Sequence, residues 1–134
     1  MNPRETLTSK FDHQKKNFQI IDELDKKIER FILKLNKNEN IVTSWSCEGM
    51  DGPRNKNGST HSIVPYFSFN VNDKTWDLVW TQIIPELMMK IQIQVSTNCY
   101  EESIFIHYPY PGGYHKDKFW KAVFEVFGKY FIEK

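Results

Sequence analysis

The sequence predicts an α+β fold, a two-layer sandwich with a four-stranded, mainly antiparallel sheet and helices on one of its faces. The first observation is the order of the periodic segments, which reads α-ββ-α-ββ-α along the chain. The second is that the strands of each pair follow one another along the chain, and such hairpin connections favour an antiparallel sheet. The third is the one-sided apolar alternation of the strands, which leaves one sheet face for helices to cover.

Length and charge indicate a single small domain. A chain of 134 residues fits one domain spanning residues 1–134. Residues 1–17 are polar except for anchors such as Leu7 and Phe11, which predicts a loosely packed N-terminal arm. The 18 basic and 17 acidic residues nearly cancel, which argues against a DNA-type basic surface. No apolar run reaches membrane length and no secretory signal is present, so we expect a cytoplasmic protein of bacterial or phage type.

Three segments have helical periodicity. In the first, apolar residues recur at steps of three and four from Ile21 to Leu35, with Asp22 as the expected N-cap. The second begins near Asp73, and Pro85 inside it predicts a kink or a break just before that residue. The third is the terminal segment 119–131.

Four segments read as strands, namely 41–47, 63–71, 91–96 and 104–108. In the first strand, strict alternation would place Trp45 and Cys47 on the core face and Ser46 on the opposite face. That opposite face is predicted to be open and polar, and it is either a docking surface or simply the solvated side of the sheet. Its expected members are Ser44, Ser46, Ser68, Asn70, Gln92 and Gln94.

The corner between the first strand and the following loop is the candidate ligand site. The strand ends in Ser46 and Cys47, and the glycine-containing loop adds further polar groups. A thiol beside a carboxylate and a histidine can act as a nucleophile with a base, although a single cysteine is more often an inert core residue. Glycines and cations in the loop are also compatible with a phosphate, and equally with a solvated surface loop. The predicted ligand-binding residues are Ser46, Cys47, Glu48, Gly49, Arg54 and His61.

Metal binding is not predicted, and neither is a cofactor. Cys47, Cys99, His61 and His107 are available ligands, but none of them forms a closely spaced pair such as C-x-x-C. Two cysteines are also too few for a disulfide framework.

A second candidate surface surrounds the segment PYPGGYH. Tyrosines beside prolines and glycines offer rigid, amphipathic contact area for gripping a protein or stacking on a base. They also suit the cover of a core end, and the two interpretations have similar weight. The predicted partner-binding residues are Tyr66, His107, Tyr110, Tyr114 and His115.

Residues 25–49, DKKIERFILKLNKNENIVTSWSCEG, carry a local resemblance. A helix ending in Leu-Asn, a short turn and a strand reading Val-Thr-x-x-Ser-Cys-x-Gly resemble the opening of the wyosine-type tRNA methyltransferases. The segment is also similar to small bacterial and phage proteins with a Ser-Cys-Glu-Gly-His motif. Glu48 stands where the methyltransferase pattern has Ser, and Met50 stands where the patterns have Arg or His. The resemblance implies a functional corner at residues 46–49 and an RNA, nucleotide or S-adenosylmethionine ligand.

Two functions of different classes remain open at this point. The small size, high aromatic content and lack of a complete catalytic set favour a cytosolic binding protein, an inhibitor or immunity-type protein that acts on a partner protein. The alternative is a nucleotide-binding or RNA-binding domain, or an S-adenosylmethionine-dependent RNA-modifying domain, that uses residues 46–49.

Overall fold

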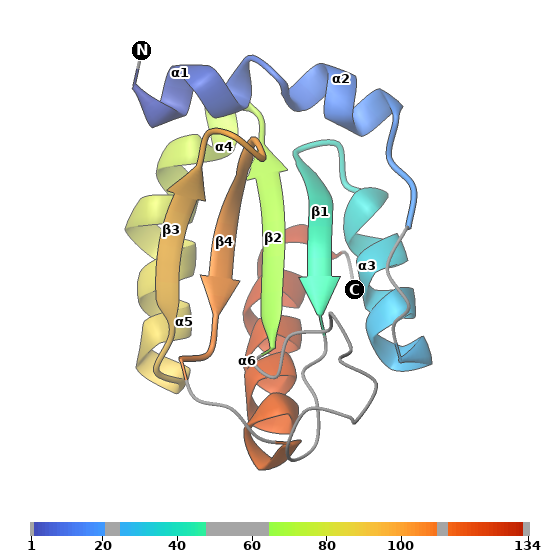
Figure 1. Ribbon diagram of the computed structural model, residues 1–134, viewed down its shortest axis with the longest axis vertical. Helices are drawn as coiled ribbons and strands as arrows, with labels where there is room; N and C mark the ends of the chain where they lie inside the picture. The colour runs from blue at the N-terminus through green and yellow to red at the C-terminus, as the bar shows by residue number, and fades with distance from the viewer. Residues whose placement is uncertain (1, 21–24, 48–64, 110–112, 133–134) are drawn as a thin grey trace.

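A computed structural model of the chain describes residues 2–20, 25–47, 65–109 and 113–132, and it has the predicted α+β architecture (Figure 1). In this view α5 and α6 lie behind the sheet, α3 lies beside β1, and α1 and α2 cross the upper end of the sheet. The helices are α1 (Pro3–Thr8), α2 (Phe11–Lys16), α3 (Lys26–Asn36), α4 (Asp73–Leu78), the π-helix η1 (Val79–Ile83), α5 (Ile84–Lys90) and α6 (Gly113–Phe131). The strands are β1 (Ile41–Cys47), β2 (Tyr66–Val71), β3 (Gln94–Asn98) and β4 (Ser103–His107).

The strands form one four-stranded sheet in the order β1-β2-β4-β3, and each neighbouring pair is antiparallel. We call the face covered by α3, α5 and α6 the inner face; it carries Phe67, Phe69, Ile104 and Ile106. Phe67 and Phe69 stack on one another, and both meet the ring of Phe127 from α6 edge-on at 5.1 Å between centroids. The opposite, outer face carries Tyr66, Ser68 and Asn70 of β2, Phe105 and His107 of β4, and Gln94 and Ser96 of β3.

The periodicity of the predicted helices is confirmed, with changes at their ends. Helix α3 buries Ile28, Phe31, Ile32 and Leu35, and its N-cap is Asp25, whose carboxylate accepts from the backbone N–H of Lys27. The expected cap Asp22 lies outside the described residues. The irregularity expected before Pro85 is the single π-helical segment η1, after which α5 begins with Pro85 in its first turn.

The N-terminal segment is not the loosely packed arm that the sequence predicted. Leu7 of α1 has no exposed surface and Phe11 of α2 is 4% exposed. Helix α1 is capped by Asn2, which accepts from the backbone N–H of Glu5, and Arg4 pairs with Asp73 at the start of α4. Two buried apolar residues and these polar contacts are enough to hold two short helices on the rest of the fold.

The predicted alternation along β1 is wrong beyond Thr43. Thr43 is opposite Phe69, and Ser46 is opposite Phe67. Between these two pairs β1 contains one more residue than β2. Such a β-bulge inverts the faces of all following residues. Ser46 therefore shares the inner face with Phe67 and is buried, contrary to the prediction that it lies on the open polar face.

The polar face is also less open than predicted. Ser68 and Asn70 have no exposed surface. The Asn70 side-chain amide donates to the backbone carbonyl of Leu7 (2.6 Å) and to Gln14 Oε1 (2.7 Å), because α1 and α2 pass over this end of the sheet. The part of the outer face that stays accessible is the other end of β2, β4 and β3.

No helix in the described part of the chain is long and apolar enough to cross a membrane.

Candidate functional site

One transverse row of the sheet brings together residues from both predicted sites. In the register, Cys47 of β1 is opposite Tyr66 of β2, Tyr66 is opposite His107 of β4, and His107 is opposite Gln94 of β3. The row thus crosses all four strands at the end of the sheet where β1 and β4 finish. Cys47, from the predicted ligand site, therefore lies in the same row as Tyr66 and His107, which were predicted to bind a partner.

The described side chains of this row form a compact set of contacts on the outer face. His107 Nε2 and Gln94 Oε1 are 2.7 Å apart, within hydrogen-bonding distance. The ring of Tyr66 lies 5.9 Å from the ring of Phe105, between centroids, at an interplanar angle of 38°. The two aromatic rings are diagonal neighbours on adjacent strands, which is a common stabilising pair.

We call Tyr66, Phe105, His107, Gln94 and Ser96 the outer-face patch. Tyr66, Phe105 and His107 are half-buried, while Gln94 and Ser96 are exposed. None of these side chains is an acid, a lysine or an arginine, so the patch carries no permanent charge. Half-buried aromatic rings surrounded by amide and hydroxyl groups are the composition typical of protein interfaces.

Phe105 was missed by the sequence analysis. The signal is present, because Phe105 and His107 are two residues apart on one strand and therefore share a face. The sequence analysis assigned no role to Phe105, whose neighbours Ile104 and Ile106 face the helices.

Several predicted site residues cannot be placed in this patch. Glu48, Gly49, Arg54, His61 and Tyr110 lie outside the described residues. Tyr114 and His115 belong to the first turn of α6, and Cys47 is the last residue of β1, but their side chains are not among those described. Ser46 is described and buried on the inner face.

The described residues contain no group of three or more His, Cys, Asp or Glu side chains that could hold a metal ion. Cys99 is exposed at the turn after β3 and forms no disulfide.

The titratable groups whose pKa values are shifted join secondary-structure elements away from the outer-face patch. Glu86 of α5 accepts from Tyr130 (2.6 Å) and Lys129 (2.9 Å) of α6, and these hydrogen bonds lower the pKa of Glu86. The bond to Glu86 raises the pKa of Tyr130. Burial lowers the pKa of Lys15, whose ammonium donates to backbone carbonyls at the end of α3 and in β1. These groups hold helices in place.

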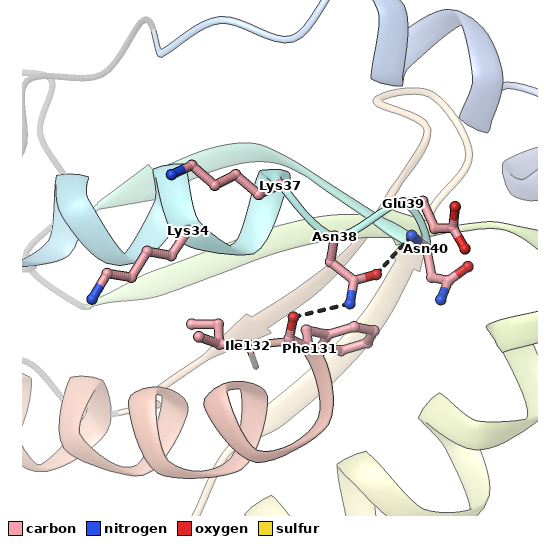
Figure 2. A pocket seen from close by; sticks show the side chains of 7 residues that line it. All are labelled: Lys34, Lys37, Asn38, Glu39, Asn40, Phe131 and Ile132. Atoms are coloured by element: carbon pink, nitrogen blue, oxygen red, sulfur yellow. Dashed lines mark hydrogen bonds between the residues drawn. The ribbon is translucent and has the colours of Figure 1, made fainter. Parts of the chain in front are cut away.

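A hollow lies between the C-terminal ends of α3 and α6 (Figure 2). Asn38 spans it, donating to the backbone carbonyl of Phe131 (2.9 Å) and accepting from the backbone N–H of Asn40 (2.8 Å). Lys34 and Lys37 extend from its rim in Figure 2 and are exposed. Because the amide of Asn38 is committed to bonds within the chain, this hollow is a junction between α3, β1 and α6.

The fold and the patch define a small α+β protein with an aromatic, neutral surface on an antiparallel sheet. Comparison of the chain with protein-family models, curated proteins and solved structures gave no match. The similarity of residues 25–49 to the wyosine-type methyltransferases therefore stays a prediction.

Proposed function

We propose that this chain is a small cytosolic binding protein that acts by binding a partner protein through the outer-face patch, as inhibitors and immunity-type proteins do. The observation that carries the proposal is the placement of Tyr66, Phe105 and His107, three half-buried ring side chains, on one face of two adjacent strands. Rings held in place by a sheet lose little conformational entropy on binding, and aromatic residues dominate the binding energy of many interfaces.

The chemistry of the patch indicates the kind of partner surface that it fits. Its aromatic rings match apolar side chains, and Gln94 and Ser96 at its margin can exchange hydrogen bonds with backbone or amide groups. A neutral patch has no strong electrostatic steering, so we expect association rates that depend only weakly on salt.

The experiment begins with a photo-crosslinking amino acid in place of Tyr66, and a second one in place of Lys121 on α6 as the control. The protein that crosslinks only from position 66 is then purified, and its complex with the chain is reconstituted. Phe105→Ala and Tyr66→Ala should each weaken that complex about tenfold or more, since aromatic hot spots contribute at least about 1.4 kcal/mol. Lys121→Ala should leave the affinity unchanged. Equal affinity of all variants, with folding verified by circular dichroism, would reject the patch as the binding surface.

A ligand site at the end of β1 is the second candidate, and the transverse row favours it. The row sets the end of β1 beside Tyr66 and His107, and such rings stack on nucleobases. A thermal-shift panel of nucleotides, S-adenosylmethionine and short RNAs tests this candidate. A ligand at a hundred times its dissociation constant should stabilise the fold by about 2.7 kcal/mol, and Glu48→Ala should remove that effect. A panel without any shift counts against this candidate and leaves the partner-protein proposal in place.

A further inference from the structure

The outer side of strand β3 is an open sheet edge. β3 is last in the strand order, and in the part of the chain that the structure describes it packs extensively against β4 alone. Its register with β4 is continuous from Gln94 to Asn98, without a bulge. Unpaired backbone groups along a regular edge strand are a template for another strand.

This edge lacks three of the features by which natural proteins block edge pairing, namely proline, charged side chains and bulges. The sequence from Ile91 to Tyr100, IQIQVSTNCY, contains no proline and no charged residue. It is therefore suited to pairing with a strand that is itself uncharged.

The helix behind this edge has an exposed side of the same character. The exposed residues of η1 and α5 are uncharged until the last position, Lys90; they are Thr81, Gln82, Pro85, Met88 and Met89. On α6, by contrast, every described exposed residue is charged; these are Asp117, Lys118, Lys121, Glu125 and Lys129. A solvated helix face is normally charged, as on α6. The uncharged exposed side of η1 and α5 therefore indicates a surface that is covered by a partner.

Large apolar side chains are exposed at both ends of β3. Met88 and Met89 lie at the end of α5, just before the strand, and are 51% and 89% exposed; Tyr100 follows the strand and is 95% exposed. Among the described residues only one other large apolar side chain, Leu33, is exposed to a comparable degree. Exposed apolar surface thus gathers around one edge of the sheet.

We propose that β3 pairs with β3 of a second copy of this chain, antiparallel about a two-fold axis, so that the two sheets become one continuous sheet. A second copy of the chain is the partner that we assign, because the sequence of β3 is complementary to itself, as an isologous interface requires. When Ser96 faces Ser96 of the second copy, Val95 faces Thr97 and Gln94 faces Asn98. No like charges are opposed, and the Val95 and Thr97 pairs are β-branched partners on the inner face. The net charge of +1 also opposes self-association only weakly.

This interface shares Gln94 and Ser96 with the margin of the outer-face patch but uses none of its aromatic rings. Met89→Lys lies outside the patch and Phe105→Ala lies outside the paired edge, so these two variants test the dimer and the partner-protein function separately. The two can fail independently.

The test is the molar mass of the purified chain by light scattering over a range of concentrations. We expect twice the 16.0 kDa of the chain at high concentration, with dissociation on dilution. Ser96→Lys should raise the dissociation constant of the dimer at least about tenfold, because two ammonium groups would then lie opposite each other on neighbouring strands. Gln19→Lys adds the same charge at an exposed position outside β3 and should leave the dimer intact.

A charge exchange makes the test specific for the register. Ser96→Lys and Ser96→Glu should each be monomeric alone, and an equimolar mixture of the two should form a heterodimer. Met89→Lys, at a position that is 89% exposed and therefore tolerant of substitution, should also weaken the dimer and serves if a Ser96 variant does not fold. A mass of 16.0 kDa at every concentration overturns the proposal, as does a dimer that neither Ser96→Lys nor Met89→Lys weakens.

Discussion

The two edges of the sheet are finished in different ways. At the β1 edge, the side chain of Asn36 from α3 takes the place of a neighbouring strand. Its Oδ1 accepts from the backbone N–H of Thr43 (3.0 Å), and its Nδ2 donates to Thr43 Oγ1 (2.9 Å) and to the backbone carbonyl of Ile32 (2.7 Å). The bulge after Thr43 adds a second obstacle to pairing.

A lysine completes the closed edge. The Lys15 ammonium donates to the backbone carbonyls of Asn36 (2.5 Å), Asn38 (2.6 Å) and Ile41 (2.7 Å), which joins α2 to the end of α3 and to the start of β1. At the β3 edge no comparable side-chain bond to the strand's backbone is found among the described residues. In the described part of the chain, one sheet edge is therefore closed by side chains of the chain itself and the other is not.

Asn36→Ala should cause the largest loss, because it opens the closed edge. It leaves the buried N–H of Thr43 without its acceptor and Thr43 Oγ1 without its donor, and we expect the free energy of unfolding to fall by about 2–3 kcal/mol. Urea denaturation measures the change. Lys34→Ala, on the exposed side of the same helix, should change stability by no more than about 0.5 kcal/mol. Equal losses in the two variants would show that the amide does not close this edge.

Lys15→Met should have the next largest effect, a loss of about 1–2 kcal/mol. The three carbonyls lose a charged donor, and the loss is limited because burial of the ammonium already has a cost, which is also why the pKa of Lys15 is lowered. Lys16→Met, at the exposed neighbouring position, is the matched control for the loss of one charge. Identical urea midpoints for both variants would contradict the role given to Lys15.

Glu102→Gly should stabilise the hairpin that carries the open edge by about 0.5 kcal/mol. Glu102 has a φ of 58°, a left-handed conformation that disfavours side chains, and glycine removes this strain at some cost in chain entropy. Glu101→Gly, one residue earlier, has no such strain to remove and should lower stability by a similar amount. Thermal denaturation measures both effects: the Tm should rise in Glu102→Gly and fall in Glu101→Gly.

The pairing of Glu86 with Tyr130 and Lys129, which holds the helix behind the open edge, should make a small pH-dependent contribution. The folded-state pKa of Glu86 is below the ordinary value of 4.5, so this contribution is complete above 4.5 and is lost as the pH falls through the folded value. Tyr130 has a raised pKa, so its contribution is present below 10.0 and is lost as the pH rises through its folded value. The Tm difference between the wild type and Tyr130→Phe should be present at neutral pH and shrink in acid and in strong base. A difference independent of pH would show that packing of the ring, and not the bond to Glu86, is what the variant removes.

The sequence predicted the main elements because their periodic signals are long. Helix α3 has buried residues at three- and four-residue steps, and the antiparallel α+β class follows from the order of helices and strands. The two N-terminal helices were missed because each buries only one residue, Leu7 or Phe11. A local signal for α1 was nevertheless present: Asn2, Pro3 and Glu5 have the order of an N-cap, a first-turn proline and an acidic third residue.

The structure tests where the predicted site residues lie, and not what they bind. Tyr66 and His107, predicted to bind a partner, lie opposite each other on neighbouring strands with Gln94 next in the row, and their role stays a prediction. The bulge in β1 could not be foreseen, because the sequence from Thr43 to Ser46 contains neither glycine nor proline and the extra residue is set by pairing with β2. The burial of Asn70 could not be foreseen either, since it depends on contacts with Leu7 and Gln14, far away in sequence.

The π-helical segment η1 sets which side of α5 faces the core relative to α4. Thr75, Val79, Ile83 and Leu87 are all buried and recur every four residues. In an uninterrupted α-helix each such step overshoots a full turn by about 40°, so three steps would rotate Leu87 about 120° away from the direction of Thr75. The wider turn at Val79–Ile83 absorbs part of this rotation and keeps the whole series directed at the core. If Val79–Ile83 wound as an α-helix without losing a residue, α5 would turn by roughly 90° and Leu87 would leave the core-facing side; deleting one residue together with the wide turn would compensate and keep α5 in phase.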